Sequence, residues 1–334
     1  MENRVRIRDI AQELGLSTAT VSNVIHGKTG KVSDETVRRV TALLEQRQYI
    51  PNMAGILLAR NSSGIIGVFV NDHPKYEGHA LEDFFISASL NALSAEIEAK
   101  GQFMMVKKAR SPEEIIQFSS MWNMEGIVVI GFCQQDYGVL RAHMRLPFVV
   151  YDGICGQTRG IGNITIDNRD GGRQLGCHLR ALGHRRALCL SDNEEGVDLE
   201  RMEGFAQGFG PGEVRRLRIP MEKAARLDFY RARLGELRQA TALFAVSDLY
   251  AVELIGFLEA QGLSVPGDAS VVGFDDMPVC RLARPNLTTV RQDSTLRARA
   301  AMDMLEKLRA GEPTEFEVRL PVSLVVRDST AKAK

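Results

Sequence analysis

One short stretch near the start of the chain places polar side chains on one face of a predicted helix. The hydroxyl groups of Thr18 and Ser22 can bond to phosphates or base edges, and the carboxamide of Asn23 can make two hydrogen bonds to adenine. Ala19 shares this face, and Ser17 precedes the helix as a favourable N-cap. These residue types suit the reading of a DNA major groove. A helical hairpin whose polar face is merely solvated fits the same pattern.

Three short helices are predicted around this face, because apolar residues repeat at helical spacing and capping residues stand at the helix ends. The positions are Ile7, Ile10, Ala11 and Leu14, then Val21, Val24 and Ile25, then Val37, Val40 and Leu44, with Gly15, Gly27 and Ser33 at the ends. The spacing of the first two helices is that of a helix-turn-helix, which places its second helix in a major groove. The stretch therefore predicts an all-α head with one small core.

Beyond the head, short apolar runs alternate with predicted helices. The runs include IIGVFV at 65–70, GIVVIG at 126–131, PFVVYD at 147–152, RALCLS at 186–191 and SVVGF at 270–274. Helices are expected at 84–100, 112–122, 136–144, 170–182, 199–209, 223–238 and 248–261. Continuous apolar strands between helices are typical of parallel sheets covered on both faces. The strand and helix segments are too many for a single sheet, so we expect an α/β body of two doubly wound lobes. A ligand cleft is expected between the lobes, at the carboxyl ends of the strands.

Composition and charge limit the function further. The formal net charge is zero, but residues 1–60 carry nine Lys/Arg and six Asp/Glu, which favours a DNA-binding role for this basic head. No apolar run approaches the roughly 18 residues of a membrane span. The first residues lack the apolar block of a secretory signal, so we expect a cytoplasmic protein without membrane contact. Five scattered cysteines without a CxxC pair predict reduced thiols and no metal site.

Sequence motifs of enzymatic chemistry are missing. The chain contains neither a GxSxG elbow nor a GxxxxGK[ST] loop. The segment GFGPG at 208–212 follows a predicted helix rather than a strand, so it is not a dinucleotide-binding loop. We therefore expect neither an enzyme nor a bound cofactor.

The segment IRDIAQELGLSTATVSNVIHGKTGKVSDETVRRV, with YIPNMAGILLA after it, resembles the head of the lactose-repressor (LacI) family of bacterial transcription regulators. The similarity continues through NITIDNRDGG, LGHRRALCL, ERMEGF and FAVSDLYAVELIGFLEAQGLSVPGDASVVGFDD to PNLTTVRQD and LPVSLVVRDST. These motifs cover essentially the whole chain in the family's order. The resemblance favours DNA binding over the solvated hairpin.

The resemblance implies a homodimer that grips a pseudo-palindromic, double-stranded operator, with the second helix of each head in a major groove. It also implies a hinge helix after the head, which pairs with its mate in the minor groove. Asn52 is expected to cap this hinge helix, and Ala54 and Gly55 are small enough for close approach of the pair. Leu58 falls where the family wedges a leucine between base pairs. An apolar linker buried on the body is the alternative for this segment.

The resemblance also implies an effector pocket in the cleft. The matching positions are Arg201 in ERMEGF, Asp275 in VVGFDD, Asp152 in VVYDG, Ser247, and the aromatic pair Phe84 and Phe85. Carboxylates accept hydrogen bonds from hydroxyl groups and a guanidinium donates in a fixed fork, so this set suits a sugar-like ligand. Each residue taken singly fits a strand-end cap or a structural ion pair equally well.

Several features depart from the family pattern, and one of them is His26, which replaces the usual asparagine of the NG turn. Asn23 stands where many members carry arginine, which changes the expected operator letters. Arg6 stands where a Thr or Ser usually caps the first helix, so that cap must come from elsewhere. The segment DHPKYEGHALED, residues 72–83, is longer than the usual connection and is expected to reshape the pocket.

The expected domains are a helix-turn-helix head at 1–51, a hinge helix and linker at 52–63, and an effector-binding and dimerisation body at 64–334. Its first lobe is expected at about 64–163 and 294–320, and its second at about 164–293 and 321–334. The predicted function is an allosteric transcription regulator, a repressor, controlled by a small sugar-like effector; induction and co-repression, and dimer and tetramer, all fit. The alternative is a periplasmic-type sugar- or nucleoside-binding protein, which would have no use for the head.

Overall fold

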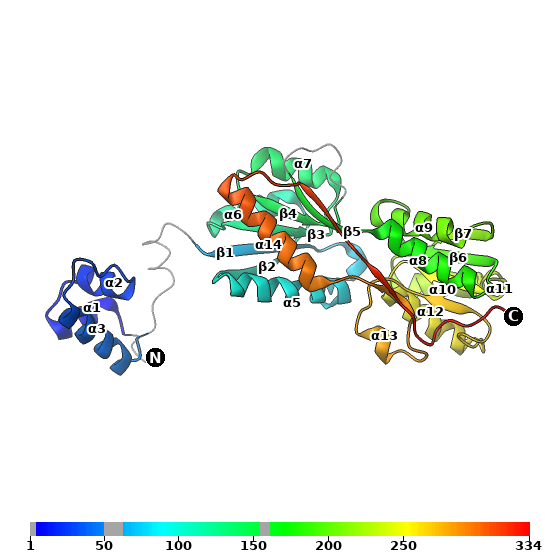
Figure 1. The fold of residues 1–334 in the computed structure, drawn as a ribbon, viewed down its shortest axis with the longest axis horizontal. Coiled ribbons are helices and arrows are strands. Elements are labelled where there is room, and N and C mark those ends of the chain that lie inside the picture. Colours follow the sequence, from blue (N-terminus) through cyan, green and yellow to red (C-terminus); the bar gives the residue numbers. More distant parts are fainter. Residues whose placement is uncertain (1–4, 50–62, 154–160) are drawn as a thin grey trace. The chain divides into compact units, whose positions relative to one another are not determined.

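The computed structural model describes residues 5–49, 63–153 and 161–334. Its contacts divide the chain into two compact units, Met1–Ser62 and Ser63–Lys334, which are described separately (Figure 1). The four predicted hinge positions, Asn52, Ala54, Gly55 and Leu58, lie outside the described residues.

The first unit contains a head of three helices, α1 (Ile7–Leu14), α2 (Thr18–Ile25) and α3 (Asp34–Gln46). Ile10, Val21 and Val40, one from each helix, are completely buried where the helices meet. The amphipathic spacing predicted these contacts, since each helix has one apolar face and needs the other two to cover it.

Local chemistry defines the turn between α1 and α2. Gly15 has a φ of 66°, the left-handed conformation in which glycine commonly ends a helix. Ser17 then caps α2 by accepting a hydrogen bond from the Thr20 backbone N–H at 3.1 Å. The missing cap of α1 is replaced by Asp9, whose carboxylate accepts from the Arg6 backbone N–H at 2.8 Å.

The first lobe of the body is built on a parallel six-stranded sheet. Its order is β11 (Glu317–Leu320), β5 (Gly162–Ile166), β4 (Phe148–Tyr151), β3 (Gly126–Ile130), β1 (Ile65–Asn71) and β2 (Phe103–Ala109). Helices α6 (Pro112–Met121) and α7 (Gln134–His143) share one core with residues of this sheet, and α5 (Phe84–Ala99) and α14 (Ser294–Ala310) share another. Adjacent strand residues alternate between these cores, so the sheet is covered on both faces.

The second lobe has a parallel four-stranded sheet in the order β7 (Glu213–Arg218), β6 (Arg186–Ser191), β8 (Ala242–Ala245) and β9 (Ser270–Val272). Its helices are α8 (Asn168–Ala181), α9 (Gly196–Phe209), α10 (Lys223–Ala232), α11 (Leu234–Gln239), α12 (Asp248–Ala260) and α13 (Val279–Leu282). An antiparallel pair, β10 (Thr289–Arg291) and β12 (Ser323–Val325), completes the body. The predicted α/β architecture of two doubly wound lobes is confirmed.

Several details differ from the sequence-based expectation. The helix expected at 223–238 is broken at Arg233, whose backbone is not helical, into α10 and α11. Helix α14 and strands β10, β11 and β12 were not predicted as elements. Strand β5 continues to Ile166, so the chain leaves the first sheet slightly beyond residue 163. None of the helices in the described ranges is both long and apolar enough to span a bilayer.

Helices α8 and α9 lie in backbone contact because glycines line their seam. A Cβ atom on Gly172 would lie 2.0 Å from the carbonyl oxygen of Arg201, and one on Gly204 would lie 1.9 Å from that of Arg169. Such distances are impossible, so a side chain at either position must push the helices apart. The seam therefore fixes where the backbone of Arg201 stands.

We expect Gly172→Ala to lower the free energy of unfolding by about 1–3 kcal/mol, the usual cost of overpacking. Differential scanning calorimetry of the purified chain measures this. Gly235→Ala in α11 is the control, because a Cβ atom there meets nothing within 4 Å and alanine favours a helix. Equal melting temperatures for the two variants would show that the seam tolerates a side chain.

Candidate functional site

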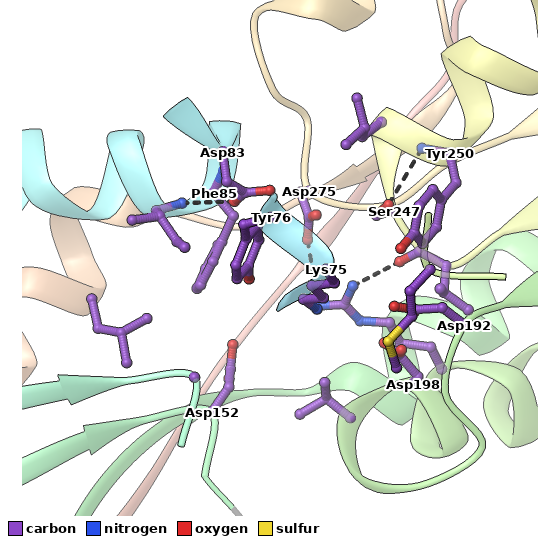
Figure 2. A pocket seen from close by; sticks show the side chains of 18 of the residues that line it. Lys75, Tyr76, Asp83, Phe85, Asp152, Asp192, Asp198, Ser247, Tyr250 and Asp275 are labelled. Atoms are coloured by element: carbon purple, nitrogen blue, oxygen red, sulfur yellow. Dashed lines mark hydrogen bonds and ion pairs between the residues drawn. The ribbon is translucent and has the colours of Figure 1, made fainter. Parts of the chain in front are cut away.

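A cavity of about 260 Å³ lies between the two lobes of the body (Figure 2). Polar lining residues stand at or just beyond the carboxyl ends of strands: Asp152 follows β4, Asp192 follows β6, and Asp275 lies beyond β9. This is where parallel α/β sheets bind ligands, since loops from several strands converge there.

Five of the six predicted effector residues line the cavity: Phe85, Asp152, Arg201, Ser247 and Asp275. Phe84 is not among the lining residues and is exposed. Successive residues of a helix point about 100° apart, and at the start of α5 Phe85 and Ile86 face the cavity while Phe84 does not. Ser247 also caps α12, its hydroxyl accepting from the Tyr250 backbone N–H at 3.4 Å.

Arg201 is buried and held by oxygen atoms on several sides. Its Nε donates to Asn168 Oδ1 at 2.8 Å and its Nη1 donates to the carbonyl oxygen of Val246 at 2.8 Å. Its Nη2 lies 3.4 Å from Asp275 Oδ1, and the guanidinium stacks 3.9 Å from the centre of the Phe274 ring. These contacts fix the guanidinium as a rigid donor in the second lobe.

Asp275 is strained and electrostatically costly. Its φ of 118° is rare for a residue with a side chain, and such strain clusters at functional sites. Its carboxylate accepts from Gln292 Nε2 at 2.7 Å. Burial raises the pKa of Asp275 well above its usual value, although the nearby Arg201 opposes the shift. A ligand that donates hydrogen bonds to this carboxylate would stabilise its charged form.

Asp152 has a similar environment in the first lobe. It adopts a φ of 50°, accepts from Thr165 Oγ1 at 3.0 Å and pairs with Arg297 Nη1 at 2.7 Å. Arg297, on α14, is only 1% exposed and lies near the rings of Phe85 and Tyr151. Sequence reasoning missed Arg297, because the helix that carries it was not predicted.

The cavity contains further charged and aromatic residues that sequence reasoning did not name. The insert contributes Lys75, Tyr76 and Asp83, and the second lobe contributes Asp192, Asp198, Arg226 and Tyr250. Only the reshaping of the pocket by the 72–83 insert was anticipated. The insert folds as two short 3-10 helices, η1 (Pro74–Tyr76) and η2 (Ala80–Glu82), and Asp83 caps α5 by accepting from the Phe85 and Ile86 backbone N–H groups.

Charge partners differ among these added residues. Arg226 makes a two-pronged pair with Glu253, at 2.6 and 2.9 Å, so its charge is neutralised within the second lobe. Tyr250 hydrogen-bonds Asp192. Burial raises the pKa of Asp198, and the Ser191 hydroxyl donates to its carboxylate at 3.1 Å. The second lobe thus places two carboxylates, Asp192 and Asp198, in the cavity. Among the described lining residues of that lobe, Arg201 is the basic side chain that Glu253 does not neutralise.

The predicted DNA-reading face of the head lies on α2. Thr18, Ala19 and Asn23 are exposed, Ser22 is partly exposed, and Ser17 caps the helix. A three-residue turn separates α1 from α2, as a helix-turn-helix requires. The polar face is therefore available to a partner, while Val21 on the opposite side fills the core.

Comparison with known proteins agrees with these features. Residues 6–52 match the model of bacterial regulatory proteins of the lacI family, and residues 177–330 match a periplasmic binding protein-like domain. The chain is 30% identical to the helix-turn-helix-type transcriptional regulator reg1 of Streptomyces lividans, and the match covers 98% of this chain and 97% of the relative. It is also 30% identical to the regulator MalR of Streptomyces coelicolor, with the same coverage.

Solved structures agree as well. The Lac repressor dimer bound to operator and the anti-inducer ONPF is 26% identical, with a TM-score of 0.84 over 98% of this chain and all of that one. A complex of the regulator CelR with cellobiose is 24% identical, with a TM-score of 0.71 and the same coverage, and supports the fold.

A helix-turn-helix head joined to a two-lobed, periplasmic-binding-like body defines a DNA-binding transcription regulator. The chain belongs to the LacI family. Its relatives are transcription regulators rather than enzymes.

We expect Asp198→Asn to stabilise the protein at neutral pH. The native pKa of Asp198 is raised above 3.8, so the folded state binds its proton more tightly than the unfolded state does. Wild-type stability attributable to this group therefore falls as the pH rises above about 4, whereas asparagine pays no such cost. Calorimetry at pH 4 and pH 7.5 should show an advantage for the variant that is present at pH 7.5 and small at pH 4. An advantage that is larger at pH 4 would contradict the assigned direction.

Proposed function

We propose that this cytoplasmic regulator acts as a homodimeric repressor that binds a near-palindromic operator through the exposed face of α2. The observation that carries the proposal is the joining of a helix-turn-helix head and a charged cleft in a single chain of the LacI family. Asn23 is assigned to adenine contact, and Thr18 and Ser22 to phosphates or base edges. For the residues beyond Tyr49, a role of Asn52, Ala54, Gly55 and Leu58 in the minor groove remains part of this proposal.

We also propose that the effector is rich in hydroxyl groups and binds in the cavity. Each lobe supplies a buried Arg–Asp pair, Arg297 with Asp152 and Arg201 with Asp275. Asp152 and Asp275 line the cavity from the two lobes and can accept hydrogen bonds from hydroxyl groups, and Arg201 can donate to such groups. Arg297 is not among the lining residues and holds Asp152 in place. The structural relatives include one complex with cellobiose, which supports a sugar-like class.

The proposed mechanism is thermodynamic linkage between the two sites. The cavity is lined from both lobes, so an effector binds best at one spacing of the lobes. An operator that favours a different spacing must weaken effector binding, and the effector must weaken operator binding by the same factor. If operator and effector favour the same spacing of the lobes, each strengthens the binding of the other by the same factor, which gives co-repression.

Selection of binding sites from random DNA with the full-length chain should recover near-palindromic sequences. Operator affinity should fall steeply as salt rises, because phosphate contacts release counterions. Asn23→Ala should cost about 1–3 kcal/mol and relax the preference at one base pair in each half-site. Gln46→Ala, an exposed position of α3, is the control and should leave the preference unchanged. Recovery of asymmetric sites would contradict the symmetric dimer.

Asp275→Asn should weaken effector binding about 10- to 100-fold, because a hydrogen bond to a charged acceptor is worth about 1.5–3 kcal/mol. A thermal-shift panel of mono- and disaccharides identifies the probe, and isothermal titration calorimetry measures its affinity. Asp303→Asn, which is exposed on α14, is the matched control. Operator affinity should stay close to wild type in both variants. Unchanged effector affinity in Asp275→Asn would place the ligand elsewhere.

A further inference from the structure

The insert between β1 and α5 is anchored to the first lobe at several points. Asp72, at its start, pairs with Lys108 of β2 at 3.0 Å. The Lys108 ammonium also donates to the carbonyl oxygen of Gly78 at 2.7 Å, further along the insert. Ala80 is completely buried in the core that α5 shares with the sheet. These contacts fix the path of the insert on the first lobe.

The anchored insert turns one aromatic side chain inward. Tyr76 is half-buried, whereas its neighbours Lys75 and Glu77 are exposed. The backbone N–H of Tyr76 donates to the carbonyl oxygen of His73 at 3.0 Å, and its carbonyl oxygen accepts from the His79 N–H at 2.7 Å. The ring lines the cavity and packs against buried apolar residues (Figure 2). Tyr76 is therefore held in place by the insert itself.

Tyr76 occupies the cavity where the sequence led us to expect Phe84. The resemblance implied an aromatic pair of adjacent residues, Phe84 and Phe85, but Phe84 is 36% exposed and lies outside the lining. Phe85 and Tyr76 line the cavity instead, one from α5 and one from the insert. The insert therefore supplies an aromatic side chain that Phe84 does not.

The second lobe presents apolar surface to the same cavity. Met221 and Leu249 line it, and they are 38% and 44% exposed. Removing apolar surface from water is favourable, so a ligand that covers these side chains binds more tightly than one that does not. The cavity therefore combines carboxylates at the strand ends with apolar side chains from both lobes.

A saccharide ring matches this combination. Its hydroxyl groups point outward around the ring, where they can donate to Asp152 and Asp275. Its C–H groups form apolar faces, and their hydrogens carry a small positive charge that the negative face of an aromatic ring attracts. An open-chain polyol has the same hydroxyl groups but no fixed apolar face.

We propose that Tyr76 is a specificity-determining residue of the cavity, whose ring stacks on the C–H face of a cyclic saccharide. The inference rests on the proposed effector cavity, and it narrows the ligand from any hydroxyl-rich molecule to one with a ring. It also moves the aromatic contact from Phe84 to the insert.

A thermal-shift panel with the full-length chain separates rings from open chains. Cellobiose, D-glucose, D-galactose and D-xylose are compared with glucitol, galactitol and xylitol, which carry similar hydroxyl groups without a ring. At least one cyclic sugar should raise the melting temperature by about 3–6 °C at about ten times its Kd, and the open-chain polyols should not. A panel in which no cyclic sugar raises the melting temperature, or in which the polyols raise it more, would overturn the proposal.

Isothermal titration calorimetry with the cyclic sugar that gives the largest shift then tests the residue. Tyr76→Leu removes the ring but stays apolar, and it should weaken the affinity about 3- to 10-fold, as expected for the loss of an aromatic contact. Tyr76→Phe keeps the ring and should bind within about two-fold of wild type. Phe84→Leu is the matched control, because it removes an exposed ring outside the lining, and it should leave the affinity unchanged.

Equal affinities of Tyr76→Leu and wild type would overturn the stacking contact. A loss that Tyr76→Phe shares would assign the effect to the hydroxyl group rather than the ring, and would overturn it as well. A loss of the same size in Phe84→Leu would return the contact to the residue that the resemblance indicated.

The proposed function fails by different results. Binding of open-chain polyols alone would remove the stacking contact and leave a hydroxyl-rich effector in place. The selection of operator sites tests DNA binding without any sugar, so its failure would remove the regulator and not the contact of Tyr76 with a ring.

Discussion

The enclosure of five aspartates in one cavity is the constraint on which the arrangement of the body depends. Carboxylates removed from water repel one another and keep their charge only beside cations or donors. The fold supplies such partners from separate elements: Arg201 from α9 stands beside Asp275, and Arg297 from α14 pairs with Asp152. Each of these pairs forms within one lobe, and the convergence of the strand ends brings their aspartates together at the cavity. Hydrogen-bond donors of a bound ligand would add to these partners by stabilising the charged carboxylates.

This convergence is reached at a cost in backbone strain and close packing. Asp152 and Asp275 occupy positive-φ conformations at the ends of their strands, one in each lobe. The seam between α8 and α9 admits only glycine at positions 172 and 204, because carbonyl oxygens occupy the space of a Cβ atom. Surrounding cores hold these features in place. Proteins commonly keep such strain where it orients functional groups.

Local patterns predicted the head and most of the body, because helix spacing, caps and apolar strands depend on residues that are neighbours in the sequence. Partners distant in sequence were harder to predict. The pair of Arg297 with Asp152 spans 145 positions, and the helix that carries Arg297 was not expected. Resemblance indicated an aromatic pair, but only Phe85 lines the cavity, whereas Phe84 is exposed. Lys75 could not be placed from sequence, since the path of an insert depends on both lobes.

The segments that cross between lobes offer a physical route from the cavity to the rest of the body. Asp276, the neighbour of Asp275, accepts from Arg291 Nε at 2.7 Å and pairs with Arg327. Arg291 ends β10 just before the chain crosses into α14, and Arg327 follows β12 just after the return crossing. The Asp167 backbone N–H also donates to the carbonyl oxygen of Leu320 at 2.9 Å, which joins two crossings directly. A ligand that moved Asp275 would also displace its neighbour Asp276 and the ion pairs of Asp276 with Arg291 and Arg327, which is a physical route from ligand contact to lobe spacing.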